Sequence, residues 1–367
     1  MEKLDYKVIR IMNKFQVVVV SAKESHAGTK APEDVTTIAK KLNFEPFYIR
    51  LNNSKPGLLN KIRRQFQFLC NWENVYKSAK GDSIILLQHP FYTRQLKRES
   101  TLLKLKKKKH VHFICVVHDV DDLRVSDTPR PYKTEKYFRC EFELMMQIAD
   151  VLIVHNTVMR DFFVQRGFDK SRIVVLEIFD YLRSGTNHKP PIYEKSITIA
   201  GNLDSRKSGY ISGLPEIACK FYLYGPNYSL GESDNITYGG VLSPEQVPEV
   251  LTKGFGLIWD GNTIETCKGG TGEYLKYNNP HKLSLYLSSG LPVIIWKDAA
   301  EAKFVCENGV GYTIDSLREI PELMERISES DYERMSKNVK NISEKLTTGK
   351  YMQCALDKAV EIISAKS

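Results

Sequence analysis

Short runs of β-branched and aliphatic residues recur along this chain, and each is followed by a stretch with helical spacing. The first is FQVVVVS at residues 15–21, and later ones include DSIILLQ at 82–88 and VHFICVV at 111–117. Runs this short and this apolar are typical of strands buried on both faces of a parallel sheet. Strands that alternate with helices predict an α/β fold with right-handed crossovers.

The alternation stops once and then restarts. Residues 184–195 (SGTNHKPPIYEK) contain glycine and two prolines, and the next apolar run is SITIA at 196–200. We interpret 184–195 as a linker between two doubly wound, Rossmann-like domains, at 1–183 and 196–345. A C-terminal helix over 346–367 could cross back to the first domain. Open α/β sheets bind ligands beyond the carboxyl ends of their strands, so two such domains facing a cleft place two binding sites together.

Length and composition agree with two folded domains. The chain has 367 residues, of which 42% are hydrophobic and 26% charged, values typical of globular proteins. The early apolar run at 15–20 is too short for a signal peptide or a membrane span. The seven cysteines include no C-x-x-C pair, which argues against zinc and against a disulfide framework. These features predict a cytoplasmic protein.

The net charge of +9 has a conspicuous source in the lysines at 104 and 106–109. No stacking motif or zinc signature accompanies them, so nucleic acid is not expected as a partner. Two interpretations stay open. The lysines contact an anionic membrane surface, at the inner face of the membrane, or they form a solvated helix end.

The stretch YNNPHK, residues 277–282, predicts a capped helix start. Asn279 suits the N-cap and Pro280 the first helical position. The free N–H groups and positive dipole end of such a helix attract anions. Lys282 lies in the first turn, where a cation disfavours the helix. A bound diphosphate would explain this lysine, whereas a plain surface lysine is the alternative.

Glycines follow several strands of the second half, which suits close approach of a ligand to the backbone. Gly201-Asn202 ends one strand, with Arg206 a few residues on, and Gly225 ends the next. A guanidinium can bind phosphate oxygens with two parallel hydrogen bonds. Each turn alone is also compatible with an ordinary loop, but their recurrence along one sheet edge favours a phosphate site.

In the first half, His118-Asp119 follows a buried strand. Either side chain could accept a proton from an acceptor hydroxyl. Asp119-x-Asp121 could instead hold a metal, or the acids could cap the next element; the two-domain organisation counts against the metal. The polar loop at 21–31 and His89, at the end of another strand, face the same edge. We therefore expect His26, Thr29 and His89 on the acceptor or sugar side.

These motifs resemble the bacterial glucosyltransferase 3-like enzymes and the related galactofuranosyltransferases. The matching blocks lie in order along both halves of the sequence. They are HDVDDLR at 118–124, IAGNLDSRKSGY at 199–210, GFGLIWDGN at 254–262, YNNPHKLSLYLSSGLPVI at 277–294 and ENGVGYTI at 307–314. The 277–294 block is the most specific of them.

The resemblance implies a GT-B fold, a UDP-sugar donor, no cofactor or obligatory metal, and transfer of galactofuranose or glucose to a sugar hydroxyl. That hydroxyl would belong to a glycan or to a lipid- or protein-linked sugar. The implied donor-site residues are Gly201, Asn202, Arg206, Tyr224, Gly225, Tyr277, Asn278, Asn279 and Lys282, with His118 or Asp119 facing the acceptor. The loop at 21–31 departs from the family pattern.

Two other functions stay open at this point. A GT-B-like epimerase or hydrolase would act on nucleotide sugars without an acceptor, and a non-catalytic partner would serve a glycosylation complex. A homo-oligomer is compatible with the sequence, which does not determine the oligomeric state.

Overall fold

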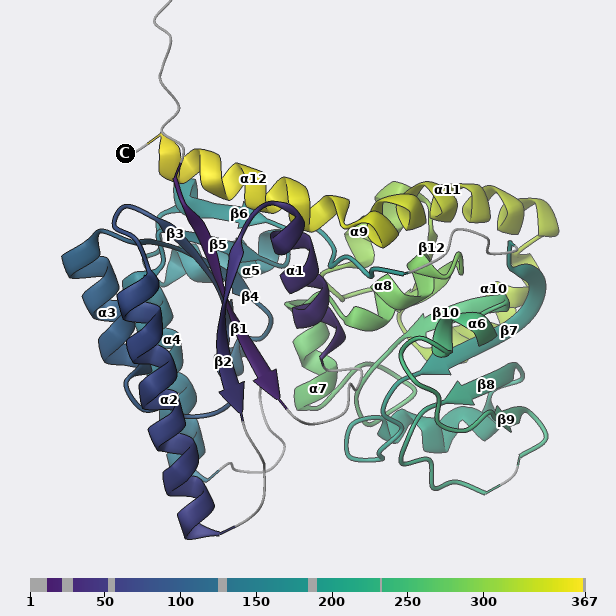
Figure 1. Ribbon diagram of the computed structural model, residues 1–367. Helices are drawn as coiled ribbons and strands as arrows, with labels where there is room; N and C mark the ends of the chain where they lie inside the picture. The colour runs from purple at the N-terminus through teal and green to yellow at the C-terminus, as the bar shows by residue number, and fades with distance from the viewer. Residues whose placement is uncertain are drawn as a thin grey trace, which may run out of the picture.

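Two parallel sheets of six strands each, covered by helices, make up the computed structural model of the protein (Figure 1). The structure describes residues 12–21, 29–51, 57–124, 131–183, 190–231 and 233–365. Among them, no helix combines the length and the apolar character needed to cross a bilayer. The predicted α/β class with two doubly wound sheets is confirmed.

The first sheet has the strand order β2-β1-β3-β4-β5-β6. Its strands are β1 (Lys14–Ser21), β2 (Glu45–Leu51), β3 (Ile84–His89), β4 (His112–Val117), β5 (Val151–Val154) and β6 (Ile173–Val175). The accompanying helices are α1 (Lys30–Lys41), α2 (Leu58–Ser78), α3 (Arg98–Lys109), α4 (Tyr132–Ile148) and α5 (Thr157–Gln165).

The second sheet has the order β12-β11-β10-β7-β8-β9. Its strands are β7 (Ile192–Ala200), β8 (Lys220–Tyr224), β9 (Ile236–Tyr238), β10 (Lys253–Ile258), β11 (Val293–Trp296) and β12 (Gly311–Ile314). The helices are α6 (Val247–Val250), α7 (Gly270–Glu273), α8 (His281–Ser288), α9 (Ala302–Asn308), α10 (Ile320–Arg326), α11 (Glu329–Thr348) and α12 (Lys350–Ser364).

Three predicted boundaries were wrong. Helical spacing in the sequence predicts a helix over residues 93–108, but α3 begins at Arg98, because Lys97 has a left-handed backbone and Gln95 accepts a buried hydrogen bond of 2.9 Å from Trp72 Nε1. The sequence also predicts a helix over residues 244–251, where the structure has the four-residue α6. Strand β7 begins at Ile192, inside the stretch that the sequence suggested as a linker.

The chain's last helix packs on the first sheet. After α11, the chain turns at Gly349, whose φ of 86° favours glycine. Helix α12 then contacts β5, β6 and α1, and it extends over the first sheet at the top of Figure 1. Its residues Met352 and Leu356 join the buried cluster that contains Ile84 and Val116. The C-terminal segment therefore contributes to the core of the first half.

Asp180 holds the start of α12. Its carboxylate accepts hydrogen bonds from Tyr351 N at 3.2 Å and Met352 N at 2.6 Å, two N–H groups that the helix itself leaves free. The side chain is buried. Burial raises the pKa of Asp180 from its ordinary value of 3.8 to about 7, against the opposing effect of the two N–H groups.

This pKa predicts a pH dependence of stability. Between pH 3.8 and about 7, the folded protein keeps a proton on Asp180 that the unfolded chain has released. The free energy of unfolding should therefore fall as pH rises through this window, by at most about 1.4 kcal/mol per pH unit. Asp180→Asn should remove this contribution. Urea unfolding at a series of pH values tests it, and identical pH profiles for both proteins would contradict it.

Candidate active site at the meeting edges of the two sheets

Hydrogen bonds between the halves bring the carboxyl ends of the two sets of strands together. Val120 N, just after β4, donates to Tyr274 Oη at 3.0 Å. Asn156 Nδ2, just after β5, donates to Tyr277 O at 3.0 Å. Loops that follow strands of the first sheet thus contact the segment between α7 and α8 of the second half. This is the edge where open α/β sheets bind ligands.

Asn279 lies at the centre of this junction and is buried. Its Nδ2 donates to His155 O at 3.0 Å and to Glu177 O at 2.8 Å, and its Oδ1 accepts from Asn156 Nδ2 at 2.8 Å. Its backbone N–H donates to His155 Nδ1 at 2.9 Å. Both N–H donors of the amide and its carbonyl oxygen are bonded to residues of the first half, so Asn279 connects the two halves. Of its neighbours, Asn278 Oδ1 is buried without a hydrogen-bond partner among the described residues.

The predicted N-cap was wrong by one residue. Pro280 is the N-cap of α8, and the side chain of Asn279 serves the junction instead of the helix. Because Asn279 is fixed between the halves, the chain enters α8 from a defined position. Lys282 is in the first turn of α8, as predicted.

The Lys282 ammonium lies between the ends of β7 and β10. Its Nζ is 2.8 Å from Asp260 Oδ1 and donates to Trp259 O at 3.2 Å. Its Cε is 3.4 Å from the position that a Cβ on Gly201 would occupy. The carboxylate of Asp260 offsets the unfavourable placement of a cation in a first helical turn. Asp260 is therefore the counter-charge of Lys282, the residue for which the sequence suggested a bound diphosphate.

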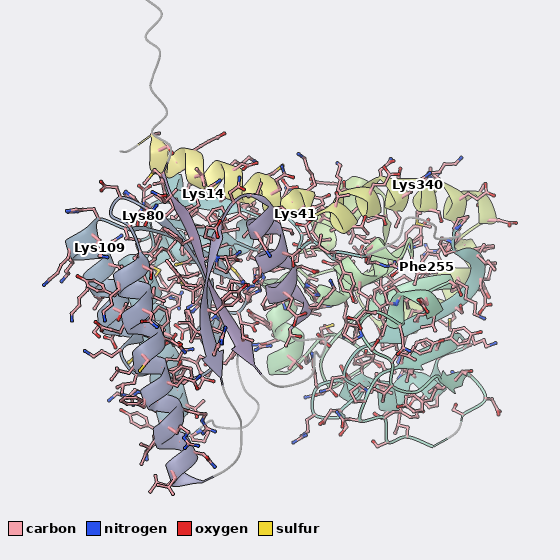
Figure 2. The ribbon with its side chains drawn as sticks, in the orientation of Figure 1. Lys14, Lys41, Lys80, Lys109, Phe255 and Lys340 are labelled. Atoms are coloured by element: carbon pink, nitrogen blue, oxygen red, sulfur yellow. The ribbon has the colours of Figure 1, made fainter. Side chains whose placement is uncertain are left out.

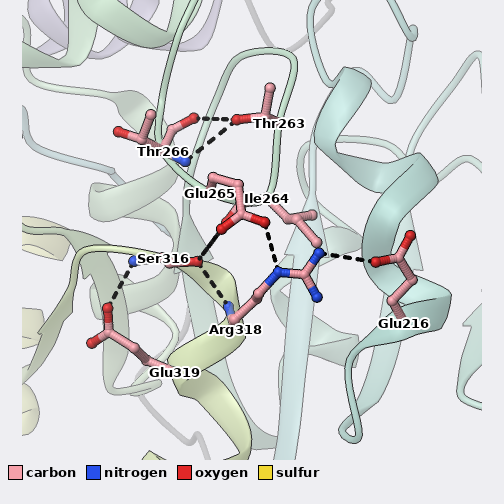
Figure 3. A network of polar contacts seen from close by, with 8 residues as sticks. All are labelled: Glu216, Thr263, Ile264, Glu265, Thr266, Ser316, Arg318 and Glu319. Carbon is pink, nitrogen blue, oxygen red and sulfur yellow. Dashed lines mark hydrogen bonds and ion pairs between the residues drawn. The ribbon is translucent and has the colours of Figure 1, made fainter.

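Asp260 is on a loop that Arg318 holds through Glu265. Figure 3 shows the guanidinium of Arg318 bound to Glu265 Oε1 at 2.6 Å and to Glu216 Oε2 at 3.0 Å. Each of these surface ion pairs is weak alone, but they share one arginine and hold the 263–266 turn that follows Asp260. Asp260 itself is buried.

Lys207 is the site residue that the sequence analysis missed. Gly261 N and Thr271 Oγ1 both donate to Lys207 O, at 3.1 and 3.3 Å, which ties this residue to the Asp260 loop. The Asp260 carboxylate acts to raise the pKa of Lys207, but burial and the charges of Lys282 and Arg124 together lower it. Its ammonium thus interacts with two cations, Lys282 and Arg124, as well as with the carboxylates of Asp260 and Asp119.

Arg206 has a different environment from Lys207. Its side chain is 88% exposed, and its guanidinium binds Asp204 Oδ1 at 3.0 Å and Oδ2 at 2.5 Å. This pairing with a residue two positions earlier directs the guanidinium to the loop surface. A phosphate-binding role for Arg206 stays a prediction, and it would require the guanidinium to leave Asp204.

The glycine turns pack against each other. Gly201 and Gly225 both have positive φ, 146° and 143°, and a Cβ on Gly225 would lie 1.7 Å from Gly201 O. Only glycine fits this contact. Asn202 Oδ1 accepts from Asn227 Nδ2 at 2.8 Å, and the Tyr224 ring packs beside Gly239. These predicted residues therefore lie along one edge, with Lys282 beside Gly201.

Asp119 faces this edge from the first half. Its Oδ2 accepts from Tyr92 Oη at 2.6 Å and lies 3.4 Å from Arg124 Nη1, and its Oδ1 accepts from Tyr274 Oη at 3.3 Å. The Arg124 guanidinium lies over the Tyr274 ring, 5.1 Å from its centroid. Two hydroxyl donors and a guanidinium thus hold the carboxylate in place.

His118 has an environment that suits a structural imidazole. It stacks on Phe179 with ring centroids 5.3 Å apart. Its Nε2 is 2.7 Å from Gln88 Oε1, while Gln88 Nε2 donates to Pro32 O and to Thr36 Oγ1. Gln88 Oε1 is thus an acceptor, which places the proton on Nε2. Burial, with smaller effects of neighbouring histidines, lowers the pKa of His118 to about 3. A base this weak is poorly matched to proton transfer near neutral pH.

The other residues predicted for the acceptor side are dispersed. His89 is buried and lines a small cavity of about 20 Å³ within the first half, together with Arg98 and Glu141. Such a cavity holds about one water. Thr29 precedes α1 and accepts from Glu33 N through its carbonyl at 3.0 Å. His26 lies outside the described residues.

The lysine run is far from this edge. Lys106 Nζ binds Asp150 at 2.9 Å, and Lys109 Nζ donates to Tyr76 O and Ala79 O at 2.6 and 2.7 Å. Figure 2 labels Lys109, Lys80 and Lys14 near the amino ends of the first sheet's strands, opposite the candidate site. Two of the five lysines thus have intramolecular partners.

The junction makes a stability prediction. Tyr274→Phe removes the hydroxyl that serves both Val120 N and Asp119, and it leaves a buried N–H without a partner. We expect the free energy of unfolding to fall by about 1–3 kcal/mol. Tyr48→Phe, at a side chain that is 49% exposed, is the control. Urea unfolding measures both, and equal stabilities for the two variants would contradict a role for Tyr274 in joining the halves.

Comparison with known proteins adds to this geometry. The model of the glucosyltransferase 3-like N-terminal domain matches residues 6–178, and that of the C-terminal domain matches residues 197–359. The beta-1,6-galactofuranosyltransferase WbbI of Escherichia coli K12 is 32% identical over 93% of this chain and 96% of its own length. Glucosyltransferase 3 of Streptococcus gordonii is 25% identical over 91% and 94%.

A solved structure has the same arrangement of two sheets. Anabaena HepE in complex with UDP-glucose aligns over 96% of this chain and 98% of its own, with a TM-score of 0.55 at 11% identity. Such a likeness at low identity shows the fold, and the two parallel sheets are those of the GT-B class. With both domain models matched in order and a relative at 32% identity, the chain belongs to the glucosyltransferase 3-like family of GT-B glycosyltransferases.

Proposed function

We propose that the protein transfers a hexose, galactofuranose or glucose, from a UDP-sugar to a sugar hydroxyl of a growing glycan. The observation that carries this proposal is the Lys282 ammonium beside the backbone turn at Gly201, with the charge of Lys207 close enough to interact with it. Both lysines belong to a cluster with Asp260 at the carboxyl edge of the second sheet. Cations next to a glycine turn and a helix start form a site for a diphosphate.

On the donor side, Lys282 would exchange part of its contact with Asp260 for a phosphate oxygen. Lys207 gains from the same anion, because its pKa is lowered by burial and by neighbouring cations. Charge that develops on UDP as the sugar leaves would then be stabilised by groups already in place. Asn278, whose buried Oδ1 has no partner among the described residues, is available to a hydroxyl of the donor.

On the acceptor side, we assign proton acceptance to Asp119 in preference to His118. The carboxylate is held at the meeting edge by Tyr92, Tyr274 and Arg124, whereas Nε2 of His118 contacts Gln88 and its ring stacks on Phe179 within the first half. Tyr274 belongs to the second half, so this arrangement also couples the acceptor residue to the donor domain. An acceptor hydroxyl next to Asp119 could lose its proton to the carboxylate while the sugar is displaced.

For the donor sugar, the relatives offer two choices. WbbI is described as a galactofuranosyltransferase and the streptococcal protein as a glucosyltransferase. Since identity to WbbI is higher, UDP-galactofuranose is the first donor to test, with UDP-glucose second. A mass-spectrometric screen of both donors against sugar acceptors identifies the product.

Removal of the Lys282 ammonium tests the donor site. Lys282→Ala should weaken UDP binding and lower the transfer rate by about 10²–10³-fold, the usual effect of losing one group that stabilises transition-state charge. Lys303→Ala, at an exposed lysine on α9 that pairs only with Glu307 among the described residues, is the control. Calorimetric titration with UDP and product analysis measure the effects. Wild-type UDP affinity and rate in Lys282→Ala would refute the proposed site.

Substitution of Asp119 separates chemistry from donor binding. Asp119→Asn should leave UDP affinity near the wild-type value and reduce transfer by about 10²–10⁴-fold, because the amide cannot accept the proton. Asp122→Asn, three positions away and 3.8 Å from Arg166, is the matched control. A transfer rate in Asp119→Asn that equals that of the control would exclude Asp119 as the base. Release of free hexose in the absence of any acceptor would instead indicate a hydrolase.

A further inference from the structure

The first half of α2 exposes a group of large apolar side chains. Leu58, Leu59, Ile62 and Phe66 are 74%, 83%, 58% and 66% exposed. In Figure 1 this end of α2 projects beyond the carboxyl ends of β1 and β2 and forms the lowest part of the molecule. We call these four side chains, with Lys61 and Arg63 between them, the α2 tip. Single exposed leucines are ordinary, whereas an apolar group of this kind marks an interaction surface.

The core does not require these side chains. In the same helix, Phe68, Trp72 and Val75 are buried and supply the contact with the first sheet. At 3.6 residues per turn, Leu58, Ile62 and Phe66 share a different face from those three. The helix therefore has a second apolar face, which covers about two turns at its projecting end.

The charged residues of this part of α2 are all positive. Residues 57–72 contain no Asp or Glu, but they contain Lys61, Arg63 and Arg64. Lys61 and Arg63 are exposed. Cations near a helix N-terminus disfavour the helix, and no acidic side chain lies in the first turn of α2. The position of these charges is therefore better explained by a partner than by helix stability.

A neighbouring loop enlarges the same surface. Gln65 Nε2 donates to Arg94 O at 2.9 Å, and Leu96 N donates to Gln65 Oε1 at 2.9 Å. These bonds hold the residues before α3 against α2. Leu96 is 49% exposed, and Arg94 and Lys97 are exposed as well. Leu96 between Arg94 and Lys97 thus adds a second exposed apolar side chain with neighbouring cations beside the α2 tip.

We propose that the α2 tip docks on an anionic lipid surface, with its apolar side chains inserted at the headgroup boundary and its basic side chains against the phosphates. Interfacial helices combine these two features. A second copy of this chain fits less well, because pairing of two α2 tips would bring like charges together. The lysines of α3, which the sequence suggested for membrane contact, lie at the opposite end of the first sheet (Figure 2).

Docking in this way would orient the candidate site. The carboxyl ends of β1 and β2 point toward the projecting end of α2 (Figure 1), so the acceptor side of the first sheet would face the lipid. An acceptor sugar attached to a lipid would then reach the protein from the membrane. Lipid binding itself does not depend on the proposed transfer reaction, and each can fail without the other.

The test is co-sedimentation of the full chain with vesicles of phosphatidylglycerol and phosphatidylcholine in about equal parts, and with vesicles of phosphatidylcholine alone. Wild type should bind the anionic vesicles, and binding should weaken as salt is added. Ile62→Ser with Phe66→Ser should reduce the partition coefficient by at least about tenfold, since two inserted side chains are lost. Lys61→Ser with Arg63→Ser should reduce it by a similar factor.

Matched controls use equally exposed residues elsewhere. Ile192→Ser with Val241→Ser removes two apolar side chains that are 68% and 64% exposed on the second half. Lys337→Ser with Lys340→Ser removes two exposed lysines from α11, where Figure 2 labels Lys340. Both controls should bind as wild type does, and thermal unfolding should show that all four variants are folded.

Three outcomes would overturn the proposal. The first is that wild type stays in the supernatant with anionic vesicles. The second is that the α2 variants bind as tightly as their controls. The third is a wild-type oligomer, seen by light scattering, that dissociates in the Ile62→Ser and Phe66→Ser variant without any lipid binding. That result would assign the α2 tip to a second copy of the chain.

Discussion

The buried amide of Asn279 sets the relation between the two halves and, through it, the position of the candidate site. The amide nitrogen donates to the backbone carbonyls of His155 and Glu177, which follow β5 and β6, and the amide oxygen accepts from Asn156 Nδ2. The next residues begin α8, so this connection places Lys282 between the ends of β7 and β10. A buried amide that makes three hydrogen bonds is costly to disturb, which makes the arrangement of charges around Lys282 and Asp260 well defined.

The fold was largely predictable from the sequence, because parallel strands buried on both faces are continuous apolar runs. The runs at 15–21, 82–88 and 111–117 correspond to β1, β3 and β4 within two residues at each end. Boundaries failed where tertiary contacts decide them. The start of α3 depends on the left-handed Lys97 and on the bond between Trp72 and Gln95, neither of which has a local signal.

The candidate site was predictable in its location and less so in its contacts. The strand ends that are followed by glycine or by His-Asp lie at the two edges that meet in the structure. The sequence could not show that Asp260 neutralises Lys282 or that Asn279 bonds to the first half, since both contacts join distant segments. Asp204, two residues before Arg206, is a local partner for that guanidinium, whereas the neighbouring Lys207 is half-buried and interacts with Asp260 and Lys282.

We propose that Lys282 and Lys207, next to the Asn279 junction, form the diphosphate site of a glycosyltransferase. A crystal structure of the protein with UDP tests it most directly. In that structure, phosphate oxygens should lie within hydrogen-bond distance of the Lys282 and Lys207 ammonium groups and next to the backbone of Gly201. Binding of the diphosphate away from both lysines, or at the amino ends of the strands, would contradict it.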